Sequence, residues 1–172
     1  MPPRSINGGS CIPHVTIEHV IMIPILLLQI FLFPVVANFL MNTWVNSRNT
    51  LVLQDALSNM GSTIQQMYFA LDHNTTILSG TTTDQFGLPE YIDGYFYTAN
   101  ATLQPSSAAT NPSQVLDITA KLATTNLEVT SQVLLGSNAR WDSATTFESN
   151  STSAGTYADM FGNGTISMGF EG

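Results

Sequence analysis

The chain has 172 residues, of which only 9% are charged, and its net charge is −8 because four basic residues face twelve acidic ones. An ordinary soluble domain is about 25% charged, so this chain has an unusually low charge content. Four basic residues cannot neutralise a run of phosphates, which excludes a nucleic-acid partner. One cysteine and three scattered histidines give no disulfide framework and no evident catalytic or metal cluster, so we expect neither an enzyme nor a bound cofactor.

The first predicted element is a long apolar helix. Twenty-six residues, Val20 to Val45, form an apolar run that extends about 39 Å as a helix, enough to cross a hydrocarbon layer of about 30 Å with some tilt. We therefore expect a membrane span over 20–45, preceded by a leader or cytoplasmic tail over 1–14. A cleavable secretory signal fits poorly, because the run is too long and no A-x-A site follows it. The only polar side chains in the run are Gln29, Asn38, Asn42 and Thr43.

Two prolines, Pro24 and Pro34, lie inside the predicted span. Each removes one helical hydrogen bond and favours a kink, which neighbouring helices in a membrane tolerate. Two interpretations stay open. The segment is either a kinked anchor helix or a helix that bends or locally melts when it packs among copies of itself.

The helix is predicted to continue beyond the membrane as an amphipathic half over 46–72, so that one helix covers 15–73. Apolar residues recur there at spacings of four and three, which places them in one stripe. Gly61 is the weak position, because glycine costs about 1 kcal/mol relative to alanine. The stripe must pack against the rest of the protein, and it consists of Leu53, Leu57, Met60, Ile64, Met67 and Leu71.

Residues 74–172 are predicted to form an extracellular β-rich head. The apolar period there changes to two and turn residues recur, which indicates β-strands. We expect a small antiparallel β-sandwich that packs on the amphipathic half of the helix, so the fold class is α+β. The predicted strands cover 91–103, 115–122, 127–135, 139–149 and a closing hairpin over 157–170.

Two groups of side chains leave alternatives open. Tyr91, Tyr95 and Tyr97 either form an exposed binding face or pack as one side of a sheet. His14 and Glu18 are four residues apart on a helix, but they would bind a metal only with a third ligand from a second chain. A place at the membrane interface is the simpler interpretation.

Four N-x-[ST] glycosylation sequons follow the span and none precedes it. Some sequons arise by chance in a chain rich in Asn and Thr, but their location on one side of the span favours an exported, glycosylated surface. We therefore expect the amino terminus in the cytoplasm and the head outside the cell. The acceptor residues are Asn74, Asn100, Asn150 and Asn163.

A glutamate just before a long apolar helix, followed by a small β-rich head, resembles the type IV pilin superfamily, and the head resembles that of archaeal pilins and archaellins. The layout matches over nearly the whole chain, and Glu18 with the apolar run after it is the one residue-level motif. The resemblance implies that a prepilin peptidase cuts the leader and that an assembly motor and platform protein extract the subunit from the membrane. The apolar helices would then pack in the core of a helical polymer through Ile21, Ile25, Leu28, Leu32 and Val36.

Glu18 itself has two interpretations. A carboxylate deep in lipid costs about 2.5–3.5 kcal/mol, which a cation such as the new α-amino group of a neighbouring subunit would offset. On the resemblance, Glu18 therefore guides docking of the next subunit. Alternatively, Glu18 is a first-turn glutamate that the helix dipole favours and that lies in the headgroup zone.

Together these features predict a structural subunit of an extracellular type IV pilus-like filament, for adhesion or motility, with identical subunits as its main partners. The subunit would reside in the cytoplasmic membrane before assembly and on the cell surface afterwards. One alternative is a membrane-anchored accessory protein, such as a minor pilin or stator-like component, that never polymerises. Another is a single-span surface protein whose head binds a small ligand or glycan.

Overall fold

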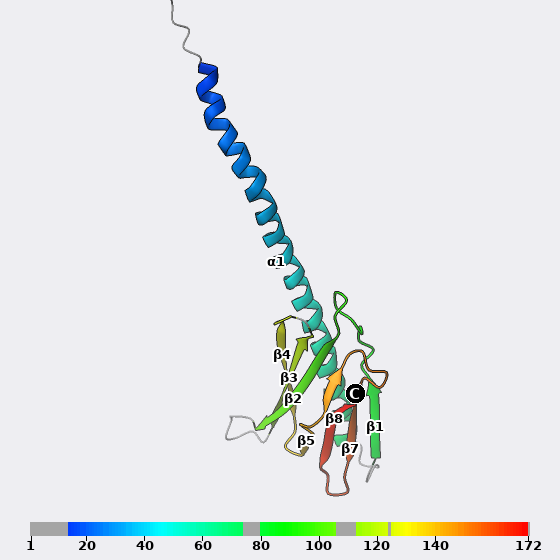
Figure 1. Ribbon diagram of the computed structural model, residues 1–172. Helices are drawn as coiled ribbons and strands as arrows, with labels where there is room; N and C mark the ends of the chain where they lie inside the picture. Colours follow the sequence, from blue (N-terminus) through cyan, green and yellow to red (C-terminus); the bar gives the residue numbers. More distant parts are fainter. Residues whose placement is uncertain (1–13, 74–79, 106–112, 124, 172) are drawn as a thin grey trace, which may run out of the picture. The chain divides into compact units, whose positions relative to one another are not determined.

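The computed structural model describes the backbone of residues 14–73, 80–105, 113–123 and 125–171, and their side chains from residue 20 onward, Pro105 excepted. The fold class is α+β, as expected: one long N-terminal apolar helix, α1 (His14–Asp72), precedes a β-rich head. The chain divides into two compact units. We call Met1–Trp44 the span unit and Val45–Gly172 the head unit, and α1 contributes to both (Figure 1).

Helix α1 begins and ends within one residue of the predicted bounds, and it stays helical through Pro24 and Pro34. In the span unit, the large apolar side chains from Val20 to Trp44 are 45–76% exposed. A helix that is apolar on all sides is stable in lipid or among other helices, but not in water. By length and composition this helix can cross a membrane.

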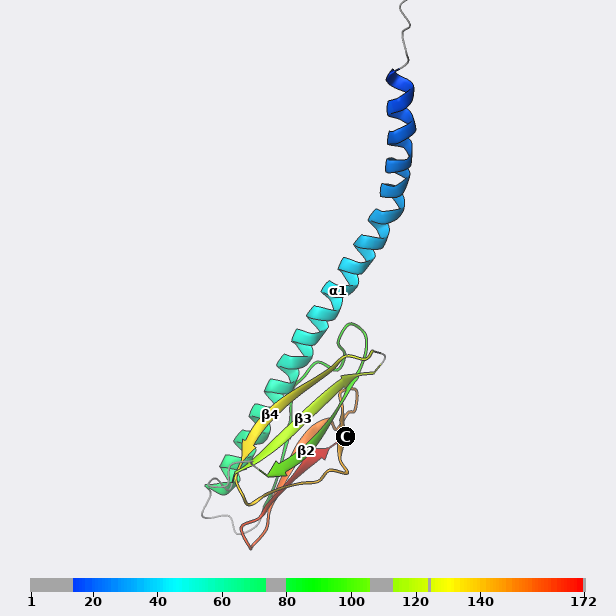
Figure 2. The same cartoon turned by 90° about the vertical axis from the view of Figure 1, so that its left-hand side faces the viewer.

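The head unit contains two four-stranded sheets with the strand orders β1-β7-β8-β5 and β4-β3-β2-β6. Neighbouring strands are antiparallel except for β5 and β8, which run parallel. The first sheet consists of β1 (Gly80–Gln85), β7 (Gly155–Met160), β8 (Ile166–Glu171) and β5 (Ala139–Trp141). The second consists of β4 (Glu128–Leu135), β3 (Gln114–Leu122), β2 (Tyr97–Pro105) and β6 (Thr146–Glu148), and Figure 2 shows three of its strands face-on.

One apolar core joins both sheets to the second half of α1. Strand β3 contributes alternate residues, and Leu116, Ile118, Ala120 and Leu122 are at most 1% exposed. The register of β2 on β3 pairs Tyr97 with Leu122, so the inward side chains of the two strands lie on the same face. Further apolar volume comes from an aromatic cluster made of Phe86, Trp141, Phe147 and Phe170.

Gly61 proves to be a point of close contact between α1 and β4. A Cβ atom at this position would lie 2.8 Å from Cγ2 of Val133, closer than two carbon atoms pack. Glycine at this position lowers the helix propensity of the segment, as the sequence indicated. Because it has no Cβ, it also lets the helix approach the sheet closely.

Three details of the β-rich part differ from the sequence-based expectation. The polar segment of β1 was not predicted as a strand. The predicted strand over 139–149 is wrong, because the chain turns after Trp141 and its two ends, β5 and β6, belong to different sheets. The predicted strand over 91–103 begins only at Tyr97, because Ile92 and Tyr95 close a tight turn in which Asp93 has φ 53°.

Candidate assembly surface

The candidate assembly surface is the apolar part of α1 in the span unit. The positions predicted to face the filament core, Ile21, Ile25, Leu28, Leu32 and Val36, are 57, 51, 62, 54 and 45% exposed. They share one side of the helix because their spacing follows the helical repeat. The other side is equally apolar and exposed, so lipid or neighbouring helices can cover the span unit on every side.

The two prolines create polar positions within this apolar surface. A proline has no backbone N–H, so the carbonyl oxygens of Val20 and Ile30, four residues before Pro24 and Pro34, lose their usual helical donors. The side chain of Gln29 lines a groove together with Pro34. An unsatisfied carbonyl in hydrocarbon is unfavourable, so both positions favour a neighbouring polar group or a local adjustment of the helix.

Glu18 lies in the first turns of α1 by its backbone. Its side chain lies outside the part of the chain whose side chains the structure describes, and so does that of His14. The docking role of Glu18 and the metal alternative therefore stay predictions. Among the residues searched for clustered ligands, no group of three or more His, Cys, Asp or Glu side chains is suited to hold a metal ion.

The apolar stripe of the amphipathic half is not part of any exposed surface. Its six residues are at most 6% exposed and belong to the core of the head unit. Two further residues on the same side of α1, Ala56 and Tyr68, are also buried. The head unit thus covers the apolar stripe of its own section of α1, whereas the apolar side chains of the span unit are uncovered.

The three described sequon asparagines are all exposed. Asn100 lies in β2, between its partners Thr119 and Thr146 on the adjacent strands. Asn150 follows β6, and Asn163 lies in the turn between β7 and β8, where its Oδ1 accepts a hydrogen bond from the backbone N–H of Thr165 at 3.0 Å. Asn74 lies outside the described residues. Glycans at the three described positions would extend into solvent.

The tyrosines that the sequence grouped together lie in different environments. Tyr97 is fully buried, while Tyr91 and Tyr95 are 53 and 42% exposed. Burial raises the pKa of Tyr97 to about 12, because a phenolate is poorly solvated in the core. Neither of the two open interpretations therefore applies to all three residues.

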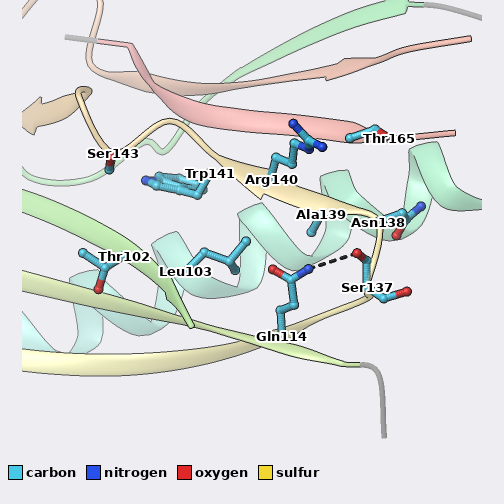
Figure 3. Close-up of a pocket in the computed structure, with 10 residues that line it drawn as sticks. All are labelled: Thr102, Leu103, Gln114, Ser137, Asn138, Ala139, Arg140, Trp141, Ser143 and Thr165. Atoms are coloured by element: carbon cyan, nitrogen blue, oxygen red, sulfur yellow. Dashed lines mark hydrogen bonds between the residues drawn. The ribbon is translucent and has the colours of Figure 1, made fainter. Parts of the chain in front are cut away.

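The head unit also has a cavity of about 710 Å³ beside β5, close to β2 and β3 (Figure 3). Most of its polar groups are hydroxyls and amides, and Gln114 donates a hydrogen bond to the carbonyl oxygen of Ser137 at 3.0 Å. Among the described residues that line the cavity, Arg140 is the one charged residue. The cavity is lined by Thr102, Leu103, Gln114, Ser137, Asn138, Ala139, Arg140, Trp141, Ser143 and Thr165.

We compared the chain with protein-family models, curated proteins and solved structures. None of them matches. Functional conclusions for this chain therefore depend on the chemistry of its own surfaces. The largest uncovered apolar surface among the described residues is that of the span unit.

Proposed function

We propose that the chain is a membrane-inserted, pilin-like subunit that polymerises through its span unit into an extracellular filament for adhesion or motility. One observation supports this most directly. The head unit buries the apolar stripe of its own section of α1, whereas the span unit is apolar and exposed on all sides. In this proposal, lipid covers the span unit first and the span units of other copies cover it later.

The side chains of the span unit favour assembly outside lipid. Transmembrane helices that associate within lipid usually meet through small residues, and Ala37 and Thr43 are the only Gly, Ala, Ser or Thr residues between Val20 and Trp44. Outside lipid, burial of 1,000 Å² of apolar surface contributes about 25 kcal/mol before the costs of association. A motor that withdraws the subunit from the bilayer would make this free energy available to the filament.

Substitution of Glu18 tests the proposal. We expect Glu18→Ala to leave the protein in the membrane but to abolish filaments, because the carboxylate would no longer pair with the amino group of a neighbouring subunit. Membrane fractionation and electron microscopy of sheared cell-surface material measure the two effects. Glu90→Ala removes an exposed acid of the head and is the matched control, which should assemble normally. Normal filaments from Glu18→Ala would contradict the docking role.

The native amino terminus separates the filament subunit from a non-polymerising accessory protein. A prepilin peptidase acts a few residues before the glutamate in the family that the chain resembles. We therefore expect mass spectrometry to find a start between residues 10 and 14. An intact Met1 on the mature protein would favour a membrane anchor.

A second candidate function is ligand binding by the head. The cavity beside β5 supports it, because hydroxyl and amide groups, the indole of Trp141 and the guanidinium of Arg140 are suited to a sugar ring and its polar substituents. A glycan array with the detergent-solubilised chain tests this function. Binding that Arg140→Ala reduces and Lys121→Ala preserves would support it, and absence of saturable binding would exclude it for the glycans tested.

A further inference from the structure

The loop between β1 and β2 exposes three aromatic side chains at one end of the head unit. Tyr91, Tyr95 and Phe96 are 53, 42 and 37% exposed, although Ile92 between them is buried. Figures 1 and 2 show this loop, in green, beside α1 at the end where the helix enters the head unit. Exposed apolar side chains that are grouped on one surface often mark a site that contacts a membrane, a protein or a ligand.

Contacts within the head unit hold this loop against the start of its helical section. Nδ2 of Asn49 donates a hydrogen bond to Oδ2 of Asp93 at 3.3 Å, and Asn49 is 7% exposed. The backbone N–H of Ala123 donates to the carbonyl oxygen of Phe96 at 3.0 Å, which ties the loop to the end of β3. These hydrogen bonds hold the loop beside α1 at the level of Asn49.

Asn49 lies one helical turn beyond Val45, the last residue of the apolar run. Four residues of helix rise about 6 Å. Each headgroup layer of a bilayer is about 5–8 Å thick, given a core of about 30 Å and a total of about 40–45 Å. When the helix is tilted so that its run of about 39 Å fills this core, residues at the level of Asn49 lie within the headgroup layer.

We propose that Tyr91, Tyr95 and Phe96 lie in the lipid headgroup layer of the membrane-inserted subunit and anchor the head at the bilayer surface. Tyrosine is suited to this layer, because its ring is apolar and its hydroxyl is polar. The proposal rests on membrane insertion of the span, but it does not depend on filament formation. It gives the exposed side chains of this loop a role before assembly.

The charges at this end of the head are mixed. Arg48 and Lys121 are exposed there, and so are the acidic residues Glu90, Asp93 and Glu128. The acidic residues offset the attraction of the two cations to anionic lipid. The aromatic rings therefore carry the contact, and we expect it to form on zwitterionic phosphatidylcholine.

Depth-dependent fluorescence quenching tests the proposal in the full chain, reconstituted into phosphatidylcholine vesicles that contain brominated acyl chains. The reporter is Tyr95→Trp in a background in which Trp44 and Trp141 are replaced by Phe. Phe161→Trp in the same background is the control, because Phe161 is 51% exposed but lies in the β7–β8 turn at the other end of the sheets (Figure 1). A third variant that keeps Trp44 and loses Trp141 reports on insertion of the span.

We expect bromines near the headgroups to quench Tyr95→Trp several-fold more strongly than Phe161→Trp, at every protein-to-lipid ratio. Equal quenching of the two reporters, with Trp44 quenched, would overturn the proposal and leave membrane insertion intact. Quenching of Tyr95→Trp that appears only at high protein density would also overturn it, because a neighbouring copy would then be bringing the loop to the lipid. Loss of Trp44 quenching would refute membrane insertion itself, and the proposal with it.

Discussion

The hydroxyl of Tyr68, near the end of α1, donates a hydrogen bond of 2.6 Å to Oδ1 of Asn138 in the turn between β4 and β5. Nδ2 of Asn138 in turn donates to Oδ1 of Asp72 at 2.9 Å and to the carbonyl oxygen of Gly164 at 3.0 Å. One asparagine side chain thus joins the helix end to two turns of the β-rich part. Burial, and secondarily the nearby Asp72 carboxylate, raise the pKa of Tyr68, because both disfavour the phenolate form.

Gly136→Ala is expected to disrupt this contact. A Cβ atom at Gly136 would collide with the Tyr68 hydroxyl, and overpacking of this kind costs about 1–3 kcal/mol. We expect denaturant unfolding in detergent to show that loss. Gly136→Ala should cost less when Tyr68→Phe is also present, because the colliding oxygen is gone. Equal costs in the two backgrounds would show that the clash is not the cause.

Tyr97→Phe is expected to stabilise the head by about 1 kcal/mol near neutral pH, because the buried Tyr97 hydroxyl has no hydrogen-bond partner among the residues that the structure describes. The pH dependence gives a second measurement. In the folded state the pKa of Tyr97 is raised from 10 to about 12, so the unfolded chain loses the tyrosine proton first as the pH rises. The stability that this proton gives the folded state is therefore fully present below pH 10 and is lost as the pH rises towards 12. Between these pH values, the thermal midpoint of the native chain should fall more steeply than that of Tyr97→Phe. Parallel curves would contradict this assignment.

Leu57→Ala is expected to destabilise the head by about 2–5 kcal/mol, because Leu57 is fully buried in the stripe of α1 and truncation leaves a cavity. Ser58→Ala is the neighbouring control. Ser58 is exposed, so its substitution should change stability by less than about 0.5 kcal/mol. Limited proteolysis of membranes that contain each variant measures the difference, and similar resistance of the two heads would argue against packing through this stripe.

Glycan occupancy is expected to differ among the described sequons. Asn150 and Asn163 lie in turns after strands, whereas Asn100 lies within β2 with strands on both sides. A modifying enzyme reaches an exposed turn of the folded head more readily than a paired strand. Glycopeptide mass spectrometry should therefore find higher occupancy at Asn150 and Asn163 than at Asn100, with Asn150→Gln as the control that removes one signal. The opposite order would indicate modification before the head folds.

The helix and its buried stripe were predictable because each depends on local periodicity. The spacing from Leu53 to Leu71 determines which side of α1 is apolar, and every residue of that stripe is buried. The alternation of β3 was equally informative, since Leu116 and Leu122 lie on its inward face. In all of these cases a single repeat along the chain carries the information.

The errors concern features without such a repeat. Strand β1 is polar and exposed, so its strand conformation depends on backbone pairing with β7 rather than on buried side chains. The turn between β5 and β6 contains neither Gly nor Pro. It depends instead on Asp142, whose Oδ1 accepts a hydrogen bond from Ala144 N–H at 3.1 Å and whose carbonyl oxygen accepts one from the Thr145 hydroxyl at 2.7 Å.

The candidate surfaces follow the same distinction. The apolar span was evident from composition alone. The aromatic loop was not, because the separation of buried Tyr97 from exposed Tyr91 and Tyr95 depends on the tight turn at Asp93 and on the distant contact with Asn49. Long-range contacts of this kind leave no periodic signal in the sequence.

The position of β8 has a consequence for biogenesis. It lies between β7 and β5, yet its residues, Ile166–Glu171, are synthesised after those of both neighbours. Until these residues have been synthesised, β7 and β5 have no strand between them and the first sheet cannot close. The head should therefore complete its fold only once Ile166–Glu171 is available for pairing.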